Sequence, residues 1–294
     1  MINRKKMVVE QALSLFVEKG ITKTSIQDIL TRSGISKGTF YNYFSSKTEC
    51  IEAILEQARY DATLMRSELM LGKDAQDTDV FINQISVLSN INRTRGLDVV
   101  FEELLHSGIL ELKKLVLKHR IIEFEWFSNR LIELFGEDIR DVAFEAAIMY
   151  YGMHQHLSFV SKLISQNAFS TTNISKSTLH YIKSIIHSLV NENTSVLDQH
   201  KLSIFRESFN NQNDAYTLEV VQEKLNDFAQ ASFTNSQKHI VQAVQQELLV
   251  KDIRFIVINA LLQAFTNEFA NTEFEIDAKE ISSLIWYFTR QQNK

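Results

Sequence analysis

The sequence predicts an all-α protein. Its 294 residues include no proline and only eight glycines, the two residue types that break helices most strongly. Apolar residues recur at spacings of three and four along almost the whole chain, which is the period of an amphipathic helix. Because 45% of the residues are hydrophobic, the chain can bury a substantial core of packed helices.

Charge is distributed unevenly along the chain. Residues 1–50 carry eight Lys and Arg against four Asp and Glu, whereas the remainder carries 23 against 32. A basic head on an acidic body suggests that the head meets a polyanion. Ordinary surface variation is the alternative explanation for such a modest excess.

The composition also bears on compartment and cofactors. Cys50 is the only cysteine, so neither an intrachain disulfide nor a cysteine-rich zinc site can form, which suits a reducing cytoplasm. The histidines show no H-x-x-x-H or H-E-x-x-H spacing, and we expect no metal and no cofactor. No run of eighteen apolar residues exists, so no membrane span is expected.

The first fifty residues are predicted to form three helices, over about 3–18, 25–32 and 37–44. Gly20 ends the first helix. Gly34 lies where the chain must turn sharply, and glycine tolerates the left-handed backbone of a tight turn.

Capping residues support the two short helices. Thr24 with Gln27 three residues on forms a candidate capping box, and Ser36 is a good N-cap for the third helix. Phe40 and Phe44 would pin the third helix to the first two. The rest of that helix offers short or polar side chains and tyrosine hydroxyls that could enter a DNA major groove: Lys37, Gly38, Thr39, Tyr41, Asn42 and Tyr43. From the residues alone, a helical hairpin with a polar face is the alternative.

This segment resembles the N-terminal domain of the tetracycline-repressor (TetR) family. The resemblance covers about residues 2–62, with the helix-turn-helix motif at 25–44, and the run S-K-G-T-F-Y-N-Y-F-x-S-K is specific to it. Leu30 departs from the family, which usually has alanine there, so the packing of the second helix is expected to differ slightly. The matching residues are Ala12, Leu15, Phe16, Gly20, Thr24, Ile29, Gly34, Ser36, Lys37, Gly38, Thr39, Tyr41, Tyr43, Phe44, Lys47 and Glu49.

The resemblance implies a DNA-binding surface. The helix from Ser36 to Phe44 would be the recognition helix, and Tyr41, Tyr43 and Lys47 would grip phosphates. The residues expected to contact DNA are Thr24, Ser25, Ser36, Lys37, Gly38, Thr39, Tyr41, Asn42, Tyr43 and Lys47.

The resemblance also suggests a division into three parts. Residues 1–48 would be the helix-turn-helix DNA-binding domain, and residues 49–191 a large helical ligand-binding and dimerisation domain. Residues 192–294 are as apolar as the rest, so we expect them to fold into an additional helical lobe. Further helices are expected over about 47–71, 79–92, 97–106, 109–135, 139–166, 175–191, 196–210, 216–233, 236–249, 252–270 and 277–291.

The additional lobe has a second interpretation. Asp138-Ile139-Arg140 aligns with Asp252-Ile253-Arg254, and a long apolar helix is expected after each. The lobe could therefore be a degenerate repeat of the regulatory helices. Chance similarity between amphipathic helices explains the alignment equally well.

Two regions of the large helical domain are candidates for assembly and ligand binding. Small and apolar residues at spacings of three and four could build a four-helix dimer interface or an internal core: Ala143, Ala146, Ala147, Tyr150, Met153, Leu157, Leu179, Ile182, Ile186 and Leu189. Aromatic residues could line a pocket for a hydrophobic effector or simply form core: Phe124, Trp126, Phe127, Phe144, Tyr150 and Tyr151.

The sequence thus predicts a cytoplasmic, homodimeric transcriptional regulator. It would be a repressor released from a pseudo-palindromic double-stranded DNA operator by an unidentified small hydrophobic ligand. The alternative is a helical protein-interaction module whose tail recruits a partner protein, without ligand-controlled DNA release. No nucleophile–base pair or phosphate loop is present, so an enzyme is not expected.

Overall fold

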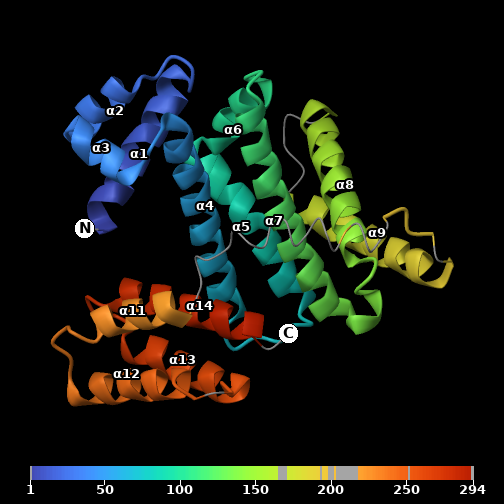
Figure 1. Ribbon diagram of the computed structural model, residues 1–294. Helices are drawn as coiled ribbons and strands as arrows, with labels where there is room; N and C mark the ends of the chain where they lie inside the picture. The colour runs from blue at the N-terminus through green and yellow to red at the C-terminus, as the bar shows by residue number, and fades with distance from the viewer. Residues whose placement is uncertain are drawn as a thin grey trace. The chain divides into compact units, whose positions relative to one another are not determined.

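The structure is a computed structural model that describes residues 2–164, 171–192, 194–197, 202, 218–250 and 252–292. These residues form helices and no strand, which confirms the predicted all-α class (Figure 1). The chain divides into two compact units. Unit 1 comprises Met1–Ala62 and Ile85–Ser195, and unit 2 comprises Thr63–Gln84 and Val196–Lys294. Within the described ranges, no helix combines the length and apolar content needed to cross a bilayer.

Unit 1 begins with the three helices of the predicted motif. They are α1 (Ile2–Lys19), α2 (Ile26–Ser33) and α3 (Lys37–Tyr43). Gly34 between α2 and α3 has φ +63°, the left-handed conformation expected of a tight turn. The three predicted helices are therefore confirmed, with bounds within one or two residues.

The capping box of α2 is shifted by one residue from its predicted place. Ser25, not Thr24, is the N-cap: its hydroxyl accepts the Asp28 N–H at 3.1 Å, and the Asp28 carboxylate accepts the Ser25 N–H at 2.8 Å. The prediction of Thr24 with Gln27 was wrong because the Thr24 hydroxyl is buried and donates to the Gly20 carbonyl at 2.7 Å. The Ser36 N-cap of α3 is confirmed.

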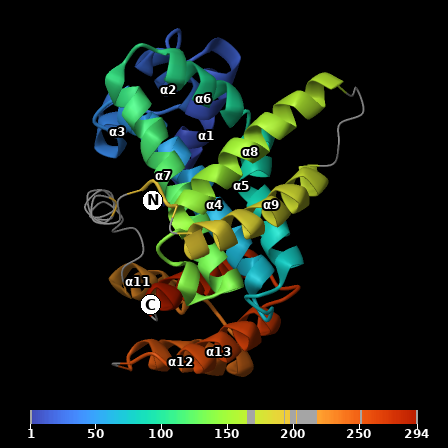
Figure 2. The ribbon, with the colours of Figure 1, turned by 90° about the vertical axis from the view of Figure 1, so that its right-hand side faces the viewer.

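Longer helices follow the motif. They are α4 (Lys47–Met70), α5 (Thr78–Arg95), α6 (Leu97–His106), α7 (Leu110–Phe135), α8 (Ala143–Ile164) and α9 (Thr171–Glu192). The helix predicted from residue 139 begins later, because Glu137–Ile139 forms a 3-10 turn, η1, before the chain turns into α8. Helices α7, α8 and α9 pack in succession, and Figure 2 shows α8 beside α9.

Unit 2 is also helical. Its C-terminal helices are α11 (Leu218–Phe228), α12 (Asn235–Leu248), α13 (Phe255–Glu268) and α14 (Glu275–Gln292). Phenylalanine rings contact one another in its core: Phe228, Phe233, Phe265, Phe269 and Phe274. The helix predicted over 196–210 lies almost entirely outside the described residues. The division at residue 192 and the repeat stay predictions.

Unit 2 also includes the ends of two helices that start or finish in unit 1. Thr63–Gln84 covers the second part of α4 and the first part of α5. There Arg66 Nε donates to the Gln84 carbonyl at 3.0 Å and Gln84 Nε2 donates to the Arg66 carbonyl at 2.8 Å, both buried. The Lys279 ammonium of α14 lies 3.3 Å from the Glu68 carboxylate of α4. The α4–α5 hairpin end and the C-terminal helices thus form one folded unit.

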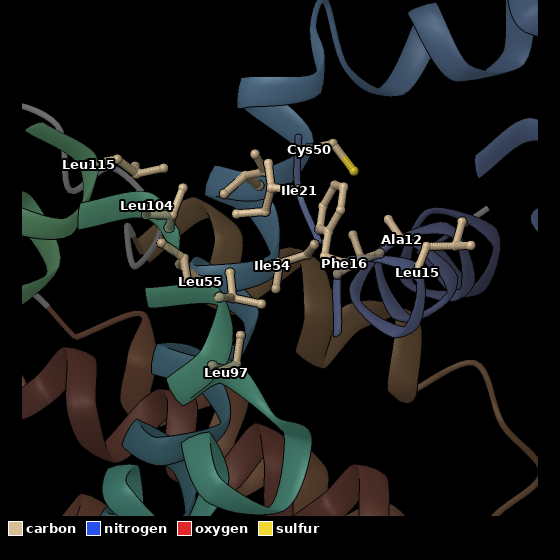
Figure 3. Packing of buried hydrophobic residues seen from close by; sticks show 14 of the residues in the cluster. Ala12, Leu15, Phe16, Ile21, Cys50, Ile54, Leu55, Leu97, Leu104 and Leu115 are labelled. Atoms are coloured by element: carbon tan, nitrogen blue, oxygen red, sulfur yellow. The ribbon is translucent and has the colours of Figure 1, made fainter. Parts of the chain in front are cut away.

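One hydrophobic core joins the motif to the helices that follow it. Phe16 of α1 is fully buried and lies in the same cluster as Ile54 of α4 and Leu97 and Leu104 of α6 (Figure 3). Helices α1–α3 therefore do not pack as a separate small domain.

The turn between α5 and α6 lies close to α1, and a substitution there tests how closely the two pack. Gly96 has φ +71°, and a Cβ placed on it would lie 3.0 Å from Val17 Cγ2 of α1. Gly108 is the matched control, because it has φ +72° and no atom within 4 Å of such a Cβ. Alanine at either position costs about 1–2 kcal/mol for its left-handed backbone. We expect Gly96→Ala to lower the free energy of unfolding by about 1 kcal/mol more than Gly108→Ala does, because the Val17 side chain, which is 38% exposed, must shift to admit the methyl group.

Urea denaturation of both variants measures this difference directly. Equal losses of stability in Gly96→Ala and Gly108→Ala would contradict close packing of α1 on the α5–α6 turn.

Candidate DNA-binding surface

Helix α3 is short, and it is held by its N-cap and by two buried rings. Ser36 Oγ accepts the Thr39 N–H at 3.1 Å. Phe40 and Phe44 are buried, with ring centroids 5.4 Å apart. These contacts fix which face of α3 points to solvent.

The exposed face of α3 carries four of the predicted contact residues. Lys37, Gly38, Tyr41 and Asn42 are exposed, while Thr39 and Tyr43 are half-buried. The Lys37 ammonium lies 6.0 Å from the centroid of the Tyr41 ring. One cation, an exposed phenol and an amide thus lie next to each other on a helix without large apolar projections, a surface that can approach base edges and phosphates.

Other predicted contact residues are already engaged within the protein. Lys47 Nζ donates to the Ile21 carbonyl at 2.9 Å and to the Thr24 carbonyl at 3.0 Å. The Thr24 hydroxyl is buried under the turn. DNA contacts by Thr24 and Lys47 stay predictions, and a phosphate contact would compete with the bonds that Lys47 makes here.

The start of α2 has an acidic group that the sequence reasoning missed. Ser25 Oγ donates to Asp28 at 2.6 Å, and this bond, the backbone bond from Ser25 and the bond from Lys19 lower the pKa of Asp28 to about 2. The carboxylate stays ionised beside the N-terminus of α2, so a phosphate approaching Ser25 would meet its charge. The spacing S-x-x-D was the available signal.

A further cation was also missed. The Lys5 ammonium lies 5.2 Å from the centroid of the Phe44 ring, so the start of α1 is next to the end of α3. The signal was the basic run Arg4-Lys5-Lys6. These residues extend the positive charge beyond the recognition helix.

The six residues predicted to line an effector pocket come together on α7 and α8. Ring centroids of Phe127 and Tyr150 lie 4.3 Å apart, and those of Phe124 and Tyr151 lie 5.3 Å apart. Phe144 packs against Phe124, and Trp126 against Phe127. The rings pack on one another, and a pocket among them stays a prediction. A groove of about 430 Å³ elsewhere in unit 1, along α1 and α4, is lined by none of the six.

Most of the candidate interface residues on α8 and α9 belong to the core of the single chain. The buried ones are Ala143, Ala146, Ala147, Tyr150, Leu179, Ile182, Ile186 and Leu189. Leu157 is exposed, and more exposed apolar side chains continue along α8: Phe159, Val160, Leu163 and Ile164. An interface on α8 would therefore use its C-terminal half.

Comparison with known proteins agrees with this geometry. The family model described as bacterial regulatory proteins, tetR family, matches residues 8–54. Over 158 residues the chain is 27% identical to the HTH-type transcriptional regulator YuxN of Bacillus subtilis (strain 168), covering 53% of this chain and 54% of YuxN. The chain thus spans about half the length of YuxN, and the two chains are nearly equally long. No solved structure matches the chain.

Two further matches are shorter. The chain is 47% identical over 49 residues to the HTH-type transcriptional regulator YvdT of Bacillus subtilis, which is 17% of this chain and 25% of YvdT. It is 34% identical over 53 residues to the HTH-type transcriptional repressor KstR2 of Mycobacterium tuberculosis (strain CDC 1551 / Oshkosh), which is 18% of this chain and 26% of KstR2. The fold and these matches define a helix-turn-helix protein. Within that class, residues 8–54 match the N-terminal domain of the TetR family.

The salt dependence of DNA binding distinguishes a phosphate contact by Lys47 from its role in holding the α1–α2 turn. Each cation that contacts a phosphate steepens the slope of log K against log salt concentration by about 0.9. Because the Lys47 ammonium is held by two carbonyls, we expect Lys47→Ala to weaken binding without changing this slope. Lys37→Ala is the matched control, because its exposed ammonium should contribute to the slope. Fluorescence anisotropy over a salt series measures both.

A slope that flattens by about 0.9 in Lys47→Ala would show instead that Lys47 grips a phosphate.

Proposed function

We propose that the protein is a homodimeric transcriptional repressor that binds a pseudo-palindromic operator. The observation that carries the proposal is α3, whose exposed face offers Lys37, Tyr41 and Asn42 on a helix fixed by buried Phe40 and Phe44. It lies inside the segment matched by the family model. Repression is supported by the printed name of KstR2, and a cytoplasmic location follows from DNA as the partner.

Dimerisation is supported by symmetry and by α8. One helix-turn-helix per chain reads one half-site, so useful affinity requires two copies on a pseudo-palindrome. Leu163 and Ile164 on α8 are 70% and 76% exposed, next to exposed Phe159 and Val160. Such a contiguous apolar stripe is typical of a protein–protein interface, and a second copy is the partner that symmetry requires.

An effector site is supported in the helices between the motif and α8. The aromatic cluster of α7 and α8 provides apolar surface. His119 on α7 adds a polar group: its Nε2 atom is buried, with no hydrogen-bond partner among the residues that the structure describes. Burial, together with the nearby charge of Arg59 and Lys118, lowers the pKa of His119 to about 3, so the ring is neutral at physiological pH. Such a buried ring nitrogen can make one hydrogen bond with a ligand.

Selection of DNA by the purified full-length chain tests the proposed function. Random duplexes retained by the protein should share a pseudo-palindrome with half-sites about one helical turn apart, and their affinity should fall steeply with salt. Retention of no preferred sequence would overturn the proposal and favour the protein-interaction alternative.

Charge placed on α8 should break the dimer. We expect the double variant Phe159→Glu and Leu163→Glu to raise the dimer dissociation constant roughly thirtyfold or more, equivalent to about 2 kcal/mol. Val99→Glu is the control, because Val99 is 53% exposed on α6, away from this stripe. Sedimentation velocity at micromolar concentration measures the association. A double variant that stays dimeric would place the interface elsewhere.

A further inference from the structure

The turn between α1 and α2 is held by a carboxylate from outside the motif. Glu103 of α6 accepts the Ile21 N–H at 2.6 Å and the Thr22 N–H at 2.9 Å. It also accepts the Thr22 hydroxyl at 3.0 Å. Three donors of one turn, more than eighty residues away in sequence, thus converge on a single side chain.

The opposite side of the same turn is held by a cation. Lys47 at the start of α4 donates to the carbonyls of Ile21 and Thr24. The turn therefore directs its N–H groups toward an anion and its carbonyls toward a cation. Such charge-assisted hydrogen bonds are roughly twice as strong as those between neutral groups.

The surroundings leave little room for the turn to move. A Cβ placed on Gly20 would lie 3.1 Å from Glu103 Oε2, so the carboxylate approaches the backbone closely. The Ile21 side chain is buried in the core that includes Leu104 of α6. Although burial raises the pKa of Glu103, the bonds from Thr22 and Ile21 outweigh it and lower the pKa overall.

We propose that Glu103 is a positioning residue for DNA binding, which it supports by clamping the α1–α2 turn together with Lys47. Helix α2 begins at Ile26, directly after this turn, and α3 packs on it. The direction of the recognition helix is therefore set from α6, by a residue that does not touch DNA. The inference rests on the proposed DNA-binding function.

Glu103→Gln tests the clamp with little change of shape. Its amide offers one oxygen and no charge, so it cannot accept all three donors with equal strength. Glu102→Gln is the matched control, because Glu102 is the exposed neighbour on the same helix and carries the same charge. Hydrogen exchange resolved by NMR should accelerate at the Ile21 and Thr22 amides in Glu103→Gln only.

DNA binding by the same two full-length variants tests the positioning role. We expect the affinity of Glu103→Gln for the selected operator to fall roughly tenfold, the scale of one lost charge-assisted hydrogen bond. The salt slope should stay unchanged, because no phosphate contact is removed. Circular dichroism should show the same helix content in both variants.

The possible results distinguish the role of Glu103 in holding the α1–α2 turn from the proposed DNA-binding function. Unchanged exchange at Ile21 and Thr22 would show that Glu103 does not hold the turn. Faster exchange with unchanged operator affinity would overturn its positioning role while leaving DNA binding intact. A wild-type protein that binds no duplex would overturn the proposed function, and with it any role of Glu103 in DNA binding.

Discussion

The packing of α1 against α4 and α6 is the constraint on which the N-terminal part of this protein depends. Phe16 is fully buried in a core to which Ile54 and Leu97 contribute from the helices that follow the motif. In a smaller domain, three short helices would bury too little apolar surface to be independently stable. Here the motif buries additional apolar surface against α4 and α6. The same contacts therefore stabilise the motif and fix its orientation.

The same dependence applies to the recognition helix. Helix α3 spans Lys37–Tyr43, far below the length at which an isolated helix is stable in water. It exists because Ser36 caps it and because Phe40 and Phe44 are buried under it. The exposed side chains Lys37, Tyr41 and Asn42 take no part in this packing, whereas the buried rings hold the helix in place.

Features that depend on contacts between residues close in sequence could be predicted, and features that depend on distant residues could not. Gly34 and the Ser36 cap act within a few residues, so the helices of the motif were predictable. The α2 cap was misassigned between Thr24 and Ser25 because two adjacent hydroxyls have suitable spacing, and burial, which is a tertiary property, decides between them. Glu103 was not predictable, since no local pattern links a carboxylate on α6 to a turn in the motif.

In the helices after the motif, periodicity identifies an apolar face but not what packs against it. Ala146 and Ile182 have the spacing of a packed face, but spacing does not tell whether the partner is the same chain or a second copy. Their burial within one chain assigns them to the core. Leu163 and Ile164, which the spacing did not single out, are among the exposed apolar side chains of α8.

Several basic residues of the motif are engaged in ion pairs or hydrogen bonds within the protein. Lys19 pairs with Asp28 at 3.1 Å, and Arg32 pairs with Glu18 at 2.8 Å. Lys47 is held by backbone carbonyls. In the described part of the chain no ion pair engages the remaining basic residues of the motif, which are Arg4, Lys5, Lys6, Lys23 and Lys37. Because Lys5 lies over the ring of Phe44, the start of α1 adds its charge beside α3. The positive surface available to a phosphate backbone is thus smaller than the sequence count indicates.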